Sequence, residues 1–130
     1  MKYQAFMARV RDRGEYADRK EAAQATEAVL RVLGERLTPH EADDLASQLP
    51  GRLGEVLQGA RGDTHEAFGV TEFQRRVTER AAPVRARGGA QDAHAVLSTV
   101  GEAVSGGELN QLISQLPSGY AALFGKPELT

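Results

Sequence analysis

The sequence contains no cysteine and no tryptophan, and only seven of its 130 residues are Tyr or Phe. Without cysteine there can be no disulfide, no thiolate metal ligand and no thiol nucleophile. No apolar run approaches the roughly 18 residues of a membrane-spanning helix. The first residues also lack the apolar centre of a secretory signal. These absences predict a cytoplasmic protein that makes no contact with a membrane.

An excess of charge of one sign is missing as well. The chain has 16 Lys and Arg residues against 18 Asp and Glu residues, which gives a net charge of -2. Strong affinity for nucleic acid usually comes with a clearly basic domain. A protein partner or self-association is therefore favoured over nucleic acid, although the sequence identifies no partner.

Strand signals are also absent, because no stretch of four to eight β-branched or aromatic residues alternates with polar ones. Ala, Leu, Glu, Arg and Gln, which favour helices, fill the segments between the glycines and prolines instead. The predicted fold class is all-α.

What the sequence does contain is an internal repeat. The phrase Ser-Gln-Leu-Pro at 47–50 returns at 114–117, an offset of 67 residues. At this offset 17 of the 54 positions in 4–57 match their counterparts without a gap, where chance would give about three or four. The chain is predicted to form two tandem four-helix repeats packed into one compact unit: a first repeat at 1–59, a connecting loop at 60–69, a second repeat at 70–126 and a tail at 127–130.

Capping signals place the helices within each repeat. Asp18 is a natural N-cap for a helix that runs to about residue 36. Thr38, Pro39 and Glu41 have the spacing of a capping box, and we expect Ser105 and Glu108 to play the same two roles in the second repeat.

The Ser-Gln-Leu-Pro phrase predicts a corner between two packed helices. Proline ends the third helix of each repeat, and the leucine before it anchors the core. We expect Gln48 and Gln115 to bond carbonyl groups left open at the helix end, in preference to a binding role. Apolar spacing of three and four residues predicts a core that includes Phe6, Val10, Val29, Leu33, Leu45 and Leu49 with Phe73, Val77, Val96, Val100, Leu112 and Leu116.

The stretches "AVLRVLGERLTPHEADDLASQLPGRL" and "AVLSTVGEAVSGGELNQLISQLPSGYAALF" resemble the bacterial family known as domain of unknown function 2267. The resemblance covers nearly the whole chain, from about Tyr3 to Phe124. It implies a compact bacterial helical protein made of two similar copies. It implies no activity, no cofactor and no functional residue.

Candidate chemistry is sparse. His40 lies one helical turn before Asp44 and beside Glu41, so a weak divalent-metal site is conceivable. The second repeat has Gly107 and Gln111 at the matching positions, and an acidic helix start favoured by the helix dipole is the simpler interpretation. His65 and His94 have no partner at an informative spacing, and the Arg-Gly-Asp triplet at 61–63 is interpreted as coincidence. The sequence predicts no catalytic, cofactor-binding or metal-binding residue.

Two pairs of arginines are the strongest functional candidates. Arg9 and Arg13, and again Arg76 and Arg80, lie four residues apart and recur at the 67-residue offset. They could bind an anionic partner. Alternatively they form ion pairs with Glu35 and Glu102, which repeat at the same offset.

We therefore expect a non-enzymatic binding or protein-interaction module. The first alternative is an anion- or nucleic-acid-associated protein that uses the four repeated arginines. The second is a metal-dependent enzyme built around His40.

Overall fold

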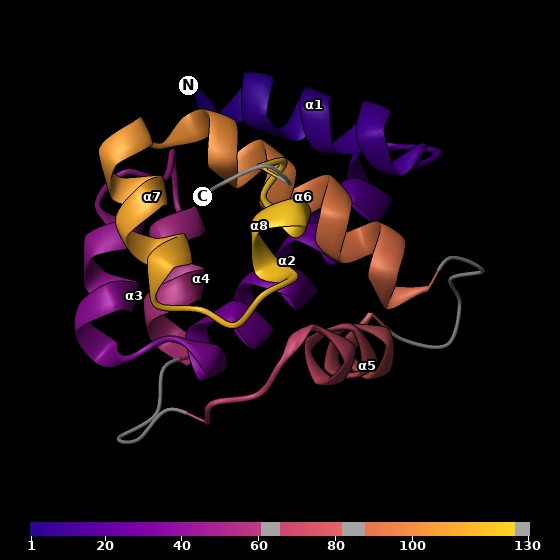
Figure 1. The fold of residues 1–130 in the computed structure, drawn as a ribbon. Helices are drawn as coiled ribbons and strands as arrows, with labels where there is room; N and C mark the ends of the chain where they lie inside the picture. Colours follow the sequence, from indigo (N-terminus) through magenta and orange to yellow (C-terminus); the bar gives the residue numbers. More distant parts are fainter. Residues whose placement is uncertain (61–65, 82–87, 127–130) are drawn as a thin grey trace.

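The computed structural model describes residues 1–60, 66–81 and 88–126, and this part of the chain forms helices and no strand. The predicted all-α fold is confirmed (Figure 1). The helices are α1 (Tyr3–Gly14), α2 (Arg19–Arg36), α3 (Pro39–Ala46), α4 (Leu53–Ala60), α5 (Val70–Arg80), α6 (Gly89–Ala103), α7 (Gly106–Ser114) and α8 (Tyr120–Leu123).

The helix bounds follow the offset that the sequence contains. Helices α5, α7 and α8 begin 67 residues after α1, α3 and α4 respectively, whereas α6 begins 70 residues after α2. Helix α4 extends to Ala60, one residue into the predicted connecting loop. Superposition of 4–57 on 71–124 stays a prediction.

The predicted caps of the first repeat are confirmed. The Asp18 carboxylate accepts a 2.9 Å hydrogen bond from the backbone N–H of Glu21. At the start of α3, the Thr38 hydroxyl accepts from the backbone of Glu41, and the Glu41 carboxylate accepts from the backbone of Thr38 at 2.9 Å. Each bond satisfies an N–H group that the first turn of a helix leaves open.

The start of α7 differs from the prediction. The Ser105 hydroxyl accepts from the backbone N–H of Glu108, as expected, but Glu108 does not complete a capping box. The backbone N–H of Ser105 instead donates a 2.7 Å hydrogen bond to the side-chain oxygen of Gln48. Gln48 therefore links the α3 corner to α7 through its side-chain oxygen. The predicted bonds from Gln48 and Gln115 to carbonyl groups at the helix ends stay a prediction.

The two proline corners are turns between helices. Helix α3 ends at Ala46, and the carbonyl of Pro50 accepts from the backbone N–H of Leu53, where α4 begins. Pro117 accepts in the same way from Tyr120 at the start of α8. The leucines before the prolines differ, since Leu49 is buried whereas Leu116 is only partly buried against the core. The other predicted core residues are buried as expected.

Helices α2 and α6 contact each other, α4 packs on α2, and α8 packs on α6, whereas α3 packs on α4 and contacts α7 (Figure 1). Helix α1 contacts both α2 and α6, and so does α5. The first helix of each predicted repeat therefore packs on the second helix of the other one. Buried side chains from both halves form a single hydrophobic cluster, which joins the halves through apolar contact.

Two matching glycines allow a close approach of helices. A Cβ atom at Gly34 would lie 2.5 Å from the carbonyl oxygen of Leu57 in α4. A Cβ atom at Gly101 would lie 2.5 Å from the carbonyl oxygen of Phe124, which follows α8. Any side chain at these positions would push the helices apart, so α2 with α4 and α6 with α8 depend on glycine there.

Every helix in the described ranges is too short or too polar to cross a membrane.

Candidate functional site

The repeated arginines of α1 meet a glutamate of α6. Arg9 Nη1 lies 2.8 Å from Glu102 Oε2, and Arg13 forms an ion pair with the other oxygen of Glu102. Arg13 also donates hydrogen bonds to the hydroxyl groups of Ser98 and Thr99, at 3.3 and 3.2 Å. We call Arg9, Arg13 and Glu102 the Glu102 cluster. It ties α1 to α6, which lie in different predicted repeats.

The repeated arginines of α5 meet a glutamate of α2 in the corresponding way. Arg76 Nη1 lies 3.5 Å from Glu35 Oε1, and Arg80 forms an ion pair with Glu35 Oε2. Arg76 also binds Glu66 at 2.7 Å and Glu72 at 2.8 Å. We call Arg76, Arg80, Glu35, Glu66 and Glu72 the Glu35 cluster. The two alternatives for these arginines were binding of an anionic partner and ion pairs with Glu35 and Glu102. The ion pairs are present at all four positions.

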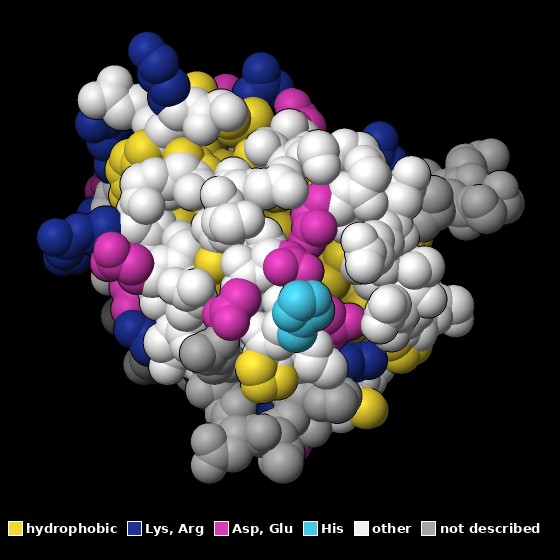
Figure 2. Space-filling view, turned by 90° about the vertical axis from the view of Figure 1, so that its left-hand side faces the viewer, with side chains coloured by type: hydrophobic (Ala, Val, Ile, Leu, Met, Phe, Trp, Pro, Cys, Tyr) yellow, Lys and Arg dark blue, Asp and Glu magenta, His cyan; other side chains and the backbone are white. Residues whose placement is uncertain are grey.

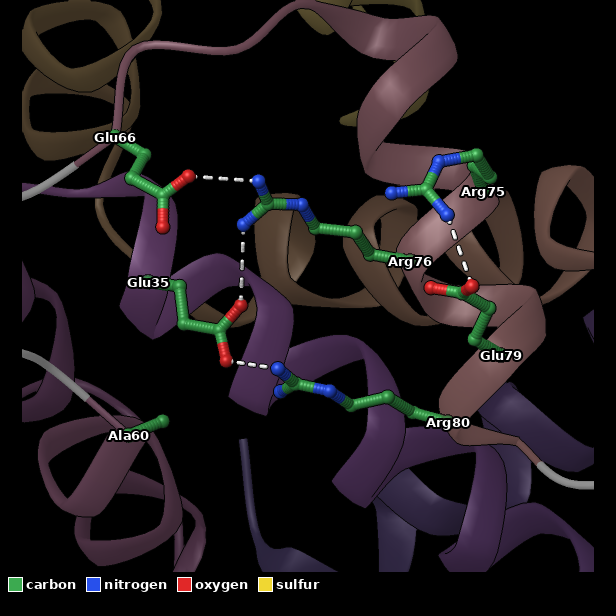
Figure 3. Close-up of a pocket in the computed structure, with 7 residues that line it drawn as sticks. All are labelled: Glu35, Ala60, Glu66, Arg75, Arg76, Glu79 and Arg80. Atoms are coloured by element: carbon green, nitrogen blue, oxygen red, sulfur yellow. Dashed lines mark hydrogen bonds and ion pairs between the residues drawn. The ribbon is translucent and has the colours of Figure 1, made fainter.

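An open pocket of about 500 Å³ lies beside the Glu35 cluster (Figure 3). Figure 3 shows Arg75, Arg76 and Arg80 reaching from α5 toward carboxylates around the hollow. Arg75 is bound on two sides, with Nη1 2.9 Å from Glu79 and Nη2 2.6 Å from Glu72. The three arginines at the pocket have four glutamate partners, which are Glu35, Glu66, Glu72 and Glu79.

This pairing determines the protonation of the pocket. Hydrogen bonds from Arg75 and Arg76 lower the pKa of Glu72 from its ordinary value of 4.5 to about 2. The same contacts raise the pKa of both guanidinium groups. At neutral pH the pocket wall therefore consists of charges that already compensate one another, three carboxylates and three guanidinium groups.

A buried arginine that no sequence pattern indicated adjoins this cluster. Arg36 in the last turn of α2 is 5% exposed, and its Nε donates a 2.7 Å hydrogen bond to the backbone carbonyl of Phe68. Tyr120 donates its hydroxyl to the same carbonyl at 2.9 Å, and burial raises the pKa of that hydroxyl. The Phe68 ring lies 4.1 Å from the guanidinium carbon of Arg76. These contacts hold the chain before α5 against the ends of α2 and α8.

The predicted candidates for metal chemistry lie on another face. Figure 2 shows a histidine among acidic side chains on the face formed by α3 and α7. His40 Nε2 lies 3.3 Å from the carboxylate of Asp44, and burial together with the charge of Asp44 raises the pKa of Glu108. Across the described residues, no three His, Asp or Glu side chains are placed to hold a metal ion. His94 is exposed on α6, whereas His65 and the triplet at 61–63 lie outside the described residues.

A surface that the sequence analysis missed lies at the start of α1. Tyr3 is 43% exposed and lies between two adjoining hollows of about 270 and 130 Å³. Both hollows are lined by Tyr3, Met7 and Ala23, and we call them together the Tyr3 groove. Arg19 and Lys20 line the larger hollow, and Arg52 lines the smaller one. Only helix packing brings α1, α2 and α4 together here, so no spacing in the sequence could have indicated the groove.

Comparison with known proteins identifies a family. A search of curated proteins found no match. A sequence profile described as "Uncharacterized conserved protein (DUF2267)" matches residues 3–123. Because this match spans nearly the whole chain, the protein belongs to the DUF2267 family of uncharacterised conserved proteins.

Proposed function

We propose that this protein is a non-enzymatic interaction module that acts in the cytoplasm. The observation that carries the proposal is the unequal distribution of paired and unpaired cations. The repeated arginines of α1 and α5 are all bound to carboxylates. In contrast, Arg19, Lys20 and Arg52 form no ion pair with any described residue. These three cations surround the exposed ring of Tyr3, as expected of a surface that meets another molecule.

The chemistry of the α5 pocket favours a structural role over catalysis. A general acid or base works best when its pKa lies near the working pH. The pKa of Glu72 is lowered to about 2, and the guanidinium groups beside it are stabilised in their charged form. These groups are therefore poor candidates for proton transfer at neutral pH, whereas they suit a rigid support between α2 and α5.

Anion binding by Arg9, Arg13, Arg76 and Arg80 stays a prediction, and their ion pairs favour the structural alternative. An anion at either cluster would have to displace Glu35 or Glu102. Such a displacement is costly because each glutamate would then lose two guanidinium partners.

Photo-crosslinking in the native cell tests the proposed function. A photoreactive phenylalanine analogue replaces Tyr3 in one variant and the exposed Ala122 of α8 in a matched control. An interaction module should give discrete adducts from position 3 that are absent from position 122. These adducts should weaken when Lys20→Glu is introduced together with the crosslinker. Identical adduct patterns at the two positions, or none at either, would argue against an interaction surface at Tyr3.

A further inference from the structure

The Tyr3 groove has a preformed apolar floor. Met7 and Leu53 are 7% and 6% exposed, so they present edges to the groove while their side chains remain in the core. The Tyr3 ring packs on Gly51, where a Cβ atom would lie 2.9 Å from Tyr3 Cδ1. Gly51 has a φ of 59°, which glycine adopts without strain. The corner after Pro50 thus supports the ring in a half-exposed position, and a partner need not order it on binding.

The size of the groove indicates what could enter it. Pockets for complete small molecules usually enclose roughly 300–1,000 Å³. The larger hollow has about 270 Å³ and the smaller about 130 Å³. Each therefore suits a single apolar side chain from a larger partner, placed on either side of the Tyr3 ring.

The rim of the groove is positively charged. Among its described lining residues the only carboxylate is Glu27, and this is held by Arg31 through bonds of 3.1 and 2.8 Å. Arg19, Lys20 and Arg52 have no such partner in the described chain. A partner that buries the Tyr3 ring would therefore bring these cations close to its own flanking residues.

We infer that the Tyr3 groove binds an acidic peptide segment of another protein, with an apolar side chain of that segment inserted beside Tyr3. This inference rests on the proposed function and adds the chemistry of the partner. Carboxylates that flank the apolar side chain would meet Arg19 and Lys20 at one end and Arg52 at the other. The charge complementarity would fix the orientation of the segment and speed its association.

Two other occupants fit the surface less well. Among the described residues, Met1 and Tyr3 are the only exposed large apolar side chains, so a second copy offers Met1 as its one such anchor outside its own groove. Amphipathic helices that lie on membranes carry a whole apolar face of large side chains. Helix α1 exposes only Tyr3 in this way, since Phe6, Met7 and Val10 are buried.

Amide-resolved NMR titration of the full chain with designed peptides tests the inference. The probe is a short Glu-rich peptide with one central Leu. Its two controls replace either the Leu by Ser or every Glu by Gln. We expect the probe alone to shift resonances at the start of α1, the start of α2 and the start of α4. If the Ser control binds as tightly as the probe, the inference is overturned, because binding would then depend on charge alone and not on an apolar side chain in the groove.

Matched variants locate the binding. Lys20→Glu should weaken binding of the probe by about fivefold, as expected for loss and reversal of one surface charge contact. Lys126→Glu makes the same change at an exposed lysine that does not line the groove, and it should leave the affinity unchanged. Tyr3→Ser should abolish the shifts, whereas Tyr3→Phe should retain them. An equal effect of the two lysine variants would contradict a specific site.

Further outcomes separate this inference from the proposed function. If the protein binds phosphatidylserine vesicles but does not bind the probe peptide, the inference of an acidic peptide partner is overturned and the groove is a membrane-binding surface. If the parent protein sediments as a dimer and the Tyr3→Ser variant as a monomer, the peptide inference is overturned, because a second copy then occupies the groove. If crosslinks from position 3 persist in the cell while the probe does not bind, the partner chemistry is wrong and the interaction module stands. If both experiments fail, both proposals fail.

Discussion

The clusters around Glu35 and Glu102 use the same residue types at the same offset, yet they lie in different surroundings. The side chains of Glu35 and Arg76 are 24% and 20% exposed, and the Phe68 ring lies against the Arg76 guanidinium. The side chains of Glu102 and Arg9 are 36% and 52% exposed, and two hydroxyl groups are the further ligands of Arg13. Two additional glutamates extend the first cluster, and none of the described residues extends the second in this way.

The comparison shows that a repeated ion pair need not contribute equally in both places. A pair that is shielded from water interacts more strongly, and a network fixes side chains that an isolated pair leaves mobile. We therefore expect the α2–α5 contact to depend on its ion pairs more than the α1–α6 contact does. The same inequality exists at the proline corners, where Leu49 is buried and Leu116 is only partly buried.

The largest expected difference between the halves concerns these two leucines. Leu49→Ala should lower the free energy of unfolding by about 2–5 kcal/mol, because it removes a buried side chain and leaves a cavity. Leu116→Ala should cost clearly less, since part of that side chain is already in water. Urea denaturation followed by circular dichroism measures both. Equal losses would show that the two corners are packed alike.

The second prediction concerns the two glutamates themselves. Glu35→Gln should cost about 1–2 kcal/mol of unfolding free energy, because two arginines lose a charged partner in a partly shielded position. Glu102→Gln should cost less than about 1 kcal/mol, as is usual for exposed ion pairs.

Double-mutant cycles refine this comparison. Glu35→Gln combined with Arg80→Gln should show a larger coupling energy than Glu102→Gln combined with Arg13→Gln. A reversed order would mean that exposure does not govern the strength of the two clusters.

The third prediction concerns acid sensitivity. The pKa of Glu72 is lowered from 4.5 to about 2 in the folded protein. The unfolded chain therefore binds a proton at Glu72 at a higher pH than the folded chain does. The stability that Glu72 contributes is fully present above about pH 4.5 and is lost as the pH falls toward 2. Glu72→Gln should flatten the pH dependence of the unfolding free energy in this window.

A control for the acid experiment comes from the exposed pair of Glu27 and Arg31, which lies outside both clusters. Glu27→Gln should leave the slope between pH 4.5 and 2 closer to that of the parent protein. If both variants flatten the slope alike, the low pKa of Glu72 does not contribute specifically to acid sensitivity.

Local features of this fold could be predicted from sequence because they depend on neighbours along the chain. Asp18 and the Thr38 capping box bond N–H groups only three residues away. The apolar spacing likewise indicated the buried face of each helix, Phe6 and Val10 being examples. The glutamate partners of the repeated arginines were identified as one alternative because both sets share the 67-residue offset.

Features that depend on how helices meet could not be predicted in this way. Gln48 bonds the backbone of Ser105, and Arg36 bonds the backbone of Phe68. A backbone acceptor or donor exists at every non-proline residue, so the sequence contains no signal for such a partner. The Tyr3 groove arises from three helices whose contact is purely tertiary. Its unpaired cations become evident only when the four repeated arginines are seen to be paired.

The last prediction has the smallest expected effect, because it expects no change in the affinity for heparin. It tests whether the repeated arginines also bind anions. Removing an arginine alone would make the net charge more negative and would weaken retention on heparin for that reason alone. Each arginine should therefore be replaced together with the glutamate to which it is bound. A variant with Arg13→Gln, Glu102→Gln, Arg80→Gln and Glu35→Gln keeps the net charge of -2. If the arginines are structural, this variant should elute at the same salt concentration as the parent once circular dichroism confirms its fold. If they bind an anion, its salt dependence should flatten, because fewer counterions are displaced on binding. We expect unchanged elution, since each of these guanidinium groups is already bound to a carboxylate of the other predicted repeat.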